Sequence, residues 1–170
     1  MPDDEHSAPD AAPDSGAGAT APPRVPPRWF VRTAWVVHRA IYRLSGGRLG
    51  LSRPKPTRWG MMHLTTTGRR TGQPRAVIVA YMEDGPNLVT LDMNGWADAE
   101  PAWWLNLQAQ PEATVTNKDG TRPVRARAAE GAERDRLWEA WKQLGDDLDA
   151  YSTLRTTPTT VVVLEPRPAG

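Results

Sequence analysis

The chain has 170 residues, of which 39% are hydrophobic, and this size suits one domain with its own core and an appended tail. It contains no cysteine, so disulfides, thiolate metal sites and a cysteine nucleophile are excluded. The net charge is only +1, but five acids fall in residues 1–23, twelve basic residues and no acid fall in 24–75, and residues 76–170 are acidic overall. A basic section of this kind attracts anions, such as a phosphorylated coenzyme, an anionic membrane or nucleic acid.

The N-terminal part divides into a tail and a helix. Residues 1–28 are acidic, rich in Ala and Pro and poor in large apolar side chains, which predicts a disordered tail. Residues 29–44 repeat apolar side chains near a 3.6-residue period, which predicts a helix, and residues 50–58 are expected to form a connector that contains proline. The helix also carries Trp and Arg, so two interpretations stay open: packing on the core, or peripheral contact with an anionic membrane. We find neither a secretory signal nor a bilayer-spanning apolar run, and we expect a cytoplasmic protein.

Beyond the connector the pattern changes to short β-prone segments separated by turn residues. Six strands are expected, at 61–67, 75–82, 88–91, 113–116, 123–129 and 159–164. Two helices are expected between them, at 101–107 and 133–144, and the second carries an apolar face. This order predicts a mainly β fold with flanking helices (α+β), built as a small closed or split β-barrel over residues 59–166.

The usual catalytic motifs are missing from this sequence. There is no GxSxG elbow, no P-loop and no GxGxxG after a strand. The three histidines, His6, His38 and His63, have no ligand spacing, so no metal site is expected. We expect His63 to be an ordinary strand residue rather than a catalytic base.

One segment, LTTTGRRTGQPR at residues 64–75, concentrates positive charge on a tight turn between two strands. Its glycines permit a left-handed backbone, and the N–H groups of such a turn can converge on an anion. Arg69 and Arg70 lie at the tip and Arg75 on the returning strand. A guanidinium binds phosphate or carboxylate oxygens in a bidentate manner. From the residues alone, an anion site and an ordinary solvated hairpin tip both remain open.

A second segment follows the third expected strand. Asn94 and Gly95 belong to a loop that leads to a helix beginning near Pro101, and such a loop can present backbone donors to an anion. Trp103 and Trp104 in that helix can flank a planar ring, although tandem tryptophans often lie in a core. We expect at least one of the two in the core.

Taken together, these segments resemble the deazaflavin-dependent nitroreductase family, within the wider group of split-barrel flavin and deazaflavin oxidoreductases. The resemblance runs from Trp59 to Pro166, and three segments carry it: LTTTGRRTGQPR (64–75), PAWWLNLQAQP (101–111) and RTTP (155–158). It implies a six-stranded split β-barrel similar to FMN-binding proteins, with coenzyme F420 in a groove of the barrel. It also implies hydride transfer from the reduced coenzyme to a small activated acceptor, such as a quinone, a nitroaromatic or an enone.

The resemblance further implies a set of site residues. Residues expected to hold the phosphate and acidic tail of F420, or to line its site, are Arg69, Arg70, Thr71, Arg75, Asn94, Gly95, Trp103 and Asn106. Hydride transfer needs no protein nucleophile, because the cofactor carries the chemistry. Negative charge that develops on the acceptor does need a donor, for which Tyr151 is the candidate and Ser152 the weaker alternative.

Three alternatives remain beside this interpretation. The barrel can be a non-enzymatic module that binds a coenzyme or a lipid, or an enzyme that uses FMN instead of F420. Nucleic-acid binding is disfavoured, because the basic section lacks the exposed aromatic strand motif of single-strand binders. We therefore expect a small-molecule acceptor and no nucleic-acid partner.

Overall fold

The computed structural model describes residues 50–93, 99–145, 148–153 and 155–168, without the side chains of Ala150 and Tyr151. The predicted tail at 1–28 and the predicted helix at 29–44 lie outside the described residues. None of the helices in the described part of the chain has the length and hydropathy that a bilayer span requires.

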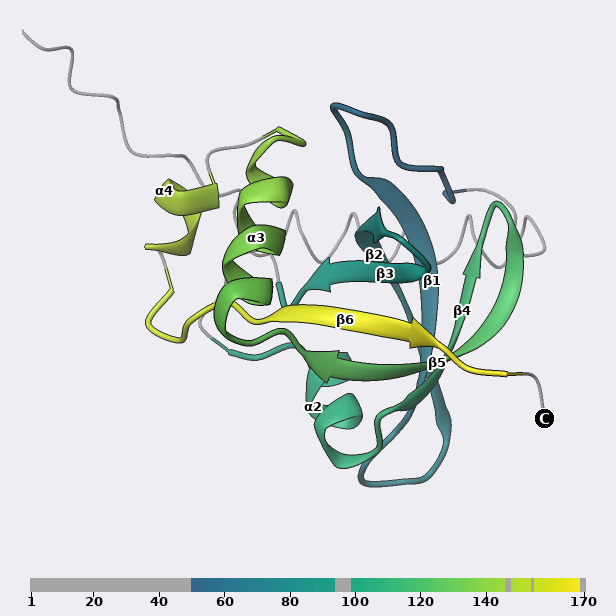
Figure 1. Cartoon of the computed structure of the whole chain (residues 1–170). Coiled ribbons are helices and arrows are strands. Elements are labelled where there is room, and N and C mark those ends of the chain that lie inside the picture. The colour runs from purple at the N-terminus through teal and green to yellow at the C-terminus, as the bar shows by residue number, and fades with distance from the viewer. Residues whose placement is uncertain (1–49, 94–98, 146–147, 154, 169–170) are drawn as a thin grey trace, which may run out of the picture.

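Six antiparallel strands form a closed barrel (Figure 1). They are β1 (Gly60–Thr67), β2 (Pro74–Asp84), β3 (Asn87–Leu91), β4 (Glu112–Asn117), β5 (Gly120–Ala128) and β6 (Val161–Pro166). Their order around the barrel is β1-β2-β3-β6-β5-β4, and β1 pairs with β4 to close it. The predicted fold class, a mainly β protein with a six-stranded barrel, is confirmed.

Side-chain alternation along the strands builds the barrel core. In β1, Met62 and Leu64 are fully buried, while Met61 and His63, which alternate with them, are half-buried on the outer face. This period of two follows from the pleat, which sends successive side chains to opposite faces. Each fully buried side chain of this size contributes about 1.5–3 kcal/mol, so the register of β1 is strongly specified.

In the described residues, three helices accompany the barrel. The helix α2 (Ala102–Ala109) begins after Pro101 and lies at the end of the barrel where the β1–β2 hairpin turns (Figure 1). The helix α3 (Gly131–Lys142) lies along one flank beside β6, with α4 (Leu148–Ser152) next to it (Figure 1). We expected α2 and α3 at nearly these positions, whereas α4 was not predicted.

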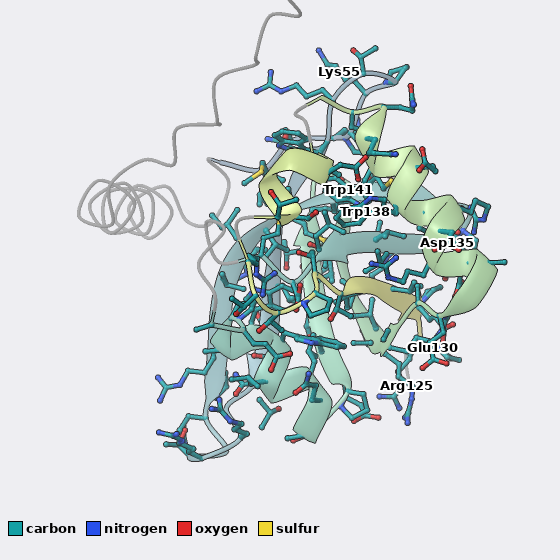
Figure 2. The ribbon with its side chains drawn as sticks, turned by 90° about the vertical axis from the view of Figure 1, so that its left-hand side faces the viewer. Lys55, Arg125, Glu130, Asp135, Trp138 and Trp141 are labelled. Carbon is teal, nitrogen blue, oxygen red and sulfur yellow. The ribbon has the colours of Figure 1, made fainter. Side chains whose placement is uncertain are left out.

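A second apolar cluster joins α3 to the barrel. Leu137 and Trp141 of α3 are buried against β3 and β6, and the Trp141 ring lies 6.2 Å from that of Trp59. In Figure 2, Trp138 and Trp141 lie on the inner side of α3, whereas Asp135 lies on its outer side. The helix therefore has one apolar face, as its sequence pattern predicts.

The connector before β1 crosses the start of that strand very closely. The N–H of Met61 donates to the carbonyl oxygen of Ser52 at 2.9 Å, which holds the connector on the strand. A Cβ at Gly60 would lie 2.6 Å from the backbone nitrogen of Pro54 and 2.7 Å from Cε1 of Tyr81. Only glycine fits at this crossing without displacing one of these groups.

Candidate functional site

The tip of the β1–β2 hairpin is a tight turn built on its glycines. The N–H of Gly68 donates to the carbonyl oxygen of Gln73 at 2.8 Å, and the N–H of Gly72 donates to that of Gly68 at 2.7 Å. Gly72 has a φ of 65°, in the left-handed region where a side chain is strained. This geometry leaves the intervening Arg69 and Arg70 exposed at the tip.

No acid in the described part of the chain neutralises the cations at this tip. Among the residues that the structure describes, none of Arg69, Arg70 and Arg75 forms an ion pair. Arg75 is exposed at the start of β2, where its Nη2 donates to Oγ1 of Thr71 at 3.5 Å. By contrast, Arg125 and Arg136 bind carboxylates at 2.7 Å. Three uncompensated guanidinium groups at one end of the barrel form a positive site suited to an acidic ligand.

Asn106 connects this tip to α2. Its side chain is 4% exposed, and its Oδ1 accepts the backbone N–H of Arg69 at 3.1 Å and Nη1 of the same arginine at 3.5 Å. Its Nδ2 donates to Oγ1 of Thr66 at 3.1 Å, and that hydroxyl donates to the carbonyl oxygen of Arg75 at 3.3 Å. Both polar atoms of the amide are therefore bound within the protein. Asn106 acts here by orienting the hairpin, and its predicted direct contact with the coenzyme stays a prediction.

An open hollow of about 290 Å³ lies beside the tip, over the paired strands β1 and β4. Its lining is formed by Thr65, Thr66, Thr67, Pro74, Glu112, Ala113 and Thr114. Four of these seven residues are threonines, whose hydroxyls both donate and accept hydrogen bonds. The hollow therefore presents hydroxyl groups beside apolar surface, and it is continuous in sequence with the hairpin through Thr67 and Pro74.

The two tryptophans of α2 belong to the barrel core. Trp103 and Trp104 are each 6% exposed, and their rings lie 6.3 Å apart at an angle of 61°. Both are buried, which fits the expectation that at least one would be. That Trp103 presents a face to the coenzyme stays a prediction.

Some of the predicted site residues are not described by the structure. Asn94 and Gly95, which were predicted to bind the coenzyme, lie outside the described residues. So does the side chain of Tyr151, the predicted proton donor, whose backbone belongs to α4. The Ser152 hydroxyl donates to the carbonyl oxygen of Asp149 at 2.8 Å. This bond occupies the Ser152 hydroxyl within α4 and leaves Tyr151 as the stronger candidate for the proton donor.

A buried ion pair was missed at the sequence level. Asp92 directly follows β3, Arg155 precedes β6, and both side chains have no exposed surface. Nη1 of Arg155 lies 3.2 Å from Oδ1 of Asp92. Burial raises the pKa of the Asp92 carboxyl, although the backbone N–H of Thr160 and the Arg155 guanidinium both favour the ionised form. The RTTP motif included Arg155, but no sequence signal indicated Asp92 as its partner.

His63 is confirmed as a strand residue of β1, half-buried on the outer face of the barrel. Burial lowers the pKa of its imidazole, so the neutral form is favoured near pH 7. A neutral imidazole among strand neighbours is consistent with the ordinary structural role expected of it.

Comparison with known proteins agrees with this geometry. The family model described as F420H(2)-dependent quinone reductase matches residues 35–166. An F420H(2)-dependent quinone reductase of Mycobacterium tuberculosis is 30% identical over 147 residues, which cover 82% of this chain and 97% of that protein. Among solved structures, a domain-swapped dimer matches with a TM-score of 0.60 at 26% identity, covering 79% of this chain and 99% of the other. An F420-H2 dependent reductase matches with a TM-score of 0.56, also at 26% identity, covering 62% and 93%.

These matches confirm the predicted F420-dependent oxidoreductase and its coenzyme. The matched region contains the whole barrel, the arginine hairpin and the Asp92–Arg155 pair. The chain belongs to the F420H(2)-dependent quinone reductase family.

Proposed function

We propose that this chain binds reduced F420 at the arginine hairpin and the adjoining hollow, and reduces a quinone by hydride transfer. The observation that carries the assignment is the set of three guanidinium groups at one end of the barrel, of Arg69, Arg70 and Arg75, which form no ion pair with any described residue. An acidic coenzyme supplies the charge that these groups lack, and each charge-assisted contact contributes about 1.5–3 kcal/mol.

Each part of the site has a task that follows from its chemistry. Arg69 and Arg70 hold acidic groups of the coenzyme, and Asn106 keeps Arg69 in place through its amide oxygen. The threonine hydroxyls of the hollow bind further polar groups of the coenzyme. The core tryptophans of α2 exclude water from the barrel side of the site. When bound, the reduced coenzyme supplies the hydride.

The acceptor receives two electrons and one hydrogen as hydride, and its reduction is completed by one further proton. We assign delivery of that proton to Tyr151, because a phenol can donate to the oxygen on which charge develops. A quinone is favoured as the acceptor, since relatives with full-length similarity carry that activity in their names. Nitroaromatics and enones are secondary candidates.

A quinone substrate also gives a reason for membrane contact. Residues 29–44 combine tryptophan, arginine and an apolar stripe, so they are suited to the surface of an anionic bilayer. We propose that this segment brings the enzyme peripherally to the inner face of the cytoplasmic membrane. Co-sedimentation with vesicles of anionic lipid, but not with neutral vesicles, is the expected result, and a variant lacking residues 1–44 should remain in solution.

Two measurements on the purified chain test the proposed function. Titration of F420 by its fluorescence should show saturable binding, whereas FMN at equal concentrations should not compete. Oxidation of reduced F420, followed by absorbance, should then depend on added quinone such as menadione. Binding of F420 without turnover of any quinone would instead establish a non-enzymatic coenzyme-binding module, and tight binding of FMN would establish a flavin enzyme.

A further inference from the structure

The ion pair of Asp92 and Arg155 extends the contact between β3 and β6 by one residue. The N–H of Asp92 donates to the carbonyl oxygen of Thr160 at 3.0 Å, and the N–H of Thr160 donates to Oδ1 of Asp92 at 2.7 Å. Nη1 of Arg155 donates to Oδ1 of Asp92 at 3.2 Å, to its carbonyl oxygen at 3.1 Å and to Oγ1 of Thr159 at 3.1 Å. One guanidinium nitrogen therefore binds the end of β3 to the segment that enters β6.

Stability alone does not account for this pair. Both side chains are fully buried, yet within the described part of the chain Nε and Nη2 of Arg155 and Oδ2 of Asp92 have no hydrogen-bond partner. A buried ion pair that is incompletely hydrogen-bonded offers little or no advantage over apolar side chains of similar volume. What the pair does provide is a fixed geometry, because the three bonds to Nη1 allow one arrangement of the two segments.

The segment that Arg155 fixes is the C-terminal end of α4. The backbone N–H of Arg155 donates to the carbonyl oxygen of Ser152 at 3.2 Å, so the arginine directly follows the last turn of the helix. With five residues, α4 is far too short to be stable without tertiary contacts. Its position must therefore be set by the residues at its two ends.

The N-terminal end of α4 is attached to α3. Asp149 accepts a hydrogen bond from Nε1 of Trp138 at 2.9 Å and one from Nζ of Lys142 at 3.1 Å. Leu148 beside it is buried in the apolar cluster between α3 and the barrel. Trp138 is seen on the side of α3 that faces α4 (Figure 2). The helix is thus attached to α3 at one end and, through Arg155, to β3 and β6 at the other.

We propose that Arg155 is a positioning residue of the reductase: with Asp92 it fixes α4, and hence the backbone of Tyr151, relative to the end of β3. This inference rests on the proposed function, which assigns proton delivery to Tyr151. The Arg155 side chain has no exposed surface, so its role in the proposal is to position α4 and not to contact the acceptor. Coenzyme affinity depends on the arginine hairpin, so loss of Arg155 alters turnover and leaves binding of F420 nearly unchanged.

The test is Arg155→Lys, which keeps the positive charge but cannot reproduce the planar guanidinium. A matched control is Arg53→Lys, the same change at an exposed ion pair with Asp119 in the turn between β4 and β5. We expect Arg155→Lys to speed amide hydrogen exchange of residues 148–153 by about tenfold or more. It should also lower kcat with menadione by about tenfold, while the Kd for F420 stays within about twofold of the wild type. Arg53→Lys should change none of the three.

Either unchanged exchange in 148–153 or unchanged kcat in Arg155→Lys would overturn the proposal. So would a parallel loss of F420 affinity, which would indicate general disruption of the barrel. If Arg155→Lys does not fold, Asp92→Asn replaces it. The amide retains Oδ1 for Thr160 and Arg155, removes the charge and replaces Oδ2 with an NH2 group. Faster exchange in 148–153 is again required. If the wild type binds F420 but reduces no quinone, the proposed function fails, and the exchange of 148–153 still decides whether Arg155 holds α4.

Discussion

The backbone N–H of Arg69 donates a hydrogen bond of 3.1 Å to the side-chain oxygen of Asn106, so a buried amide in α2 positions an exposed cation at the hairpin tip. The same amide donates to Thr66 in β1, which links helix, strand and turn in one network. Because this network holds the hairpin tip in place, the tip loses less conformational entropy when a ligand binds.

Replacing Asn106 should therefore weaken coenzyme binding without removing any charge. Asn106→Ala leaves the N–H of Arg69 without its acceptor, and we expect a Kd for F420 about tenfold higher, equivalent to about 1.4 kcal/mol. Fluorescence titration measures this change. Gln110→Ala, at the exposed end of the same helix, is the control and should bind normally. An Asn106→Ala protein that is folded and binds F420 with wild-type affinity would contradict the positioning role.

Removing a charge at the tip should have a larger effect. Arg70→Ala is expected to weaken F420 binding by one to two orders of magnitude, since a charge-assisted contact contributes about 1.5–3 kcal/mol. Lys55→Ala removes an equal charge from the connector, at the end of the molecule away from the hairpin (Figure 2), and should leave the Kd unchanged. Equal effects of the two substitutions would indicate that only net charge matters.

The proposed proton donor can be separated from coenzyme binding. Tyr151→Phe should lower kcat with menadione by about 100-fold, the lower end of the range for general acid catalysis, and should preserve the Kd for F420. Tyr81→Phe serves as the control, because Tyr81 is fully buried in the barrel core. Wild-type turnover in Tyr151→Phe would assign the proton to solvent.

The glycine at the start of β1 offers a test of packing. Gly60→Ala places a Cβ 2.6 Å from the carbonyl oxygen of Ser52, and the displacement should lower the free energy of unfolding by about 2–3 kcal/mol. Urea denaturation of Gly60→Ala and Gly85→Ala compares the cost of a steric clash with the cost of a strained backbone. Gly85 has a φ of 59°, and a Cβ added there would meet no described atom within 4 Å, so its substitution should cost only about 1–2 kcal/mol of backbone strain. A smaller loss at Gly60 than at Gly85 would be inconsistent with the close crossing.

The ion pairs that join α3 to the barrel should contribute less to stability at acid pH. Arg127 binds Glu133 of α3 and Glu165 of β6, and its guanidinium lowers the pKa of the Glu133 carboxyl. A carboxyl whose folded-state pKa is lowered contributes stability above its unfolded pKa, about 4.3, and loses that contribution as the pH falls through the folded value.

Glu133→Gln should accordingly reduce stability by about 0.5–1 kcal/mol at pH 7, the value of a partly exposed pair. The difference from the wild type should shrink as the pH falls below the unfolded value of about 4.3 and should disappear once the carboxyl is protonated in the folded state as well. Urea unfolding across this range provides the measurement, and Glu130→Gln, just before α3 on the surface, is the control (Figure 2). A difference that does not depend on pH would assign the role of Glu133 to packing.

The parts of this molecule that could be predicted are those encoded locally. The period of two in β1 and β2 and the glycines of residues 68–72 determine the hairpin from neighbouring residues alone. The apolar face of α3 likewise follows from its own sequence. The arginine hairpin could be located for the same reason, since its charge and its turn lie in one segment.

Contacts between distant residues could not be predicted. Arg155 lies 63 residues from Asp92, and an Asp at a strand end is also an ordinary turn residue. The helix α4 has no periodic pattern, because its stability comes from α3 and from Arg155 rather than from its own side chains. Asn106 was found only through the resemblance, and its bond to Arg69 across 37 residues depends on how α2 packs on the barrel.

The position of β6 in the barrel has a consequence for biosynthesis. This strand pairs with both β3 and β5, although it is the last to leave the ribosome. Until residues 161–166 emerge, the nascent barrel has two open strand edges, which are templates for aggregation. The hairpin that carries the arginines can form early, but the Asp92–Arg155 pair cannot form until its second member is synthesised. Substitutions near β6 should therefore reduce the yield of folded protein in cells more than their effect on the finished molecule indicates.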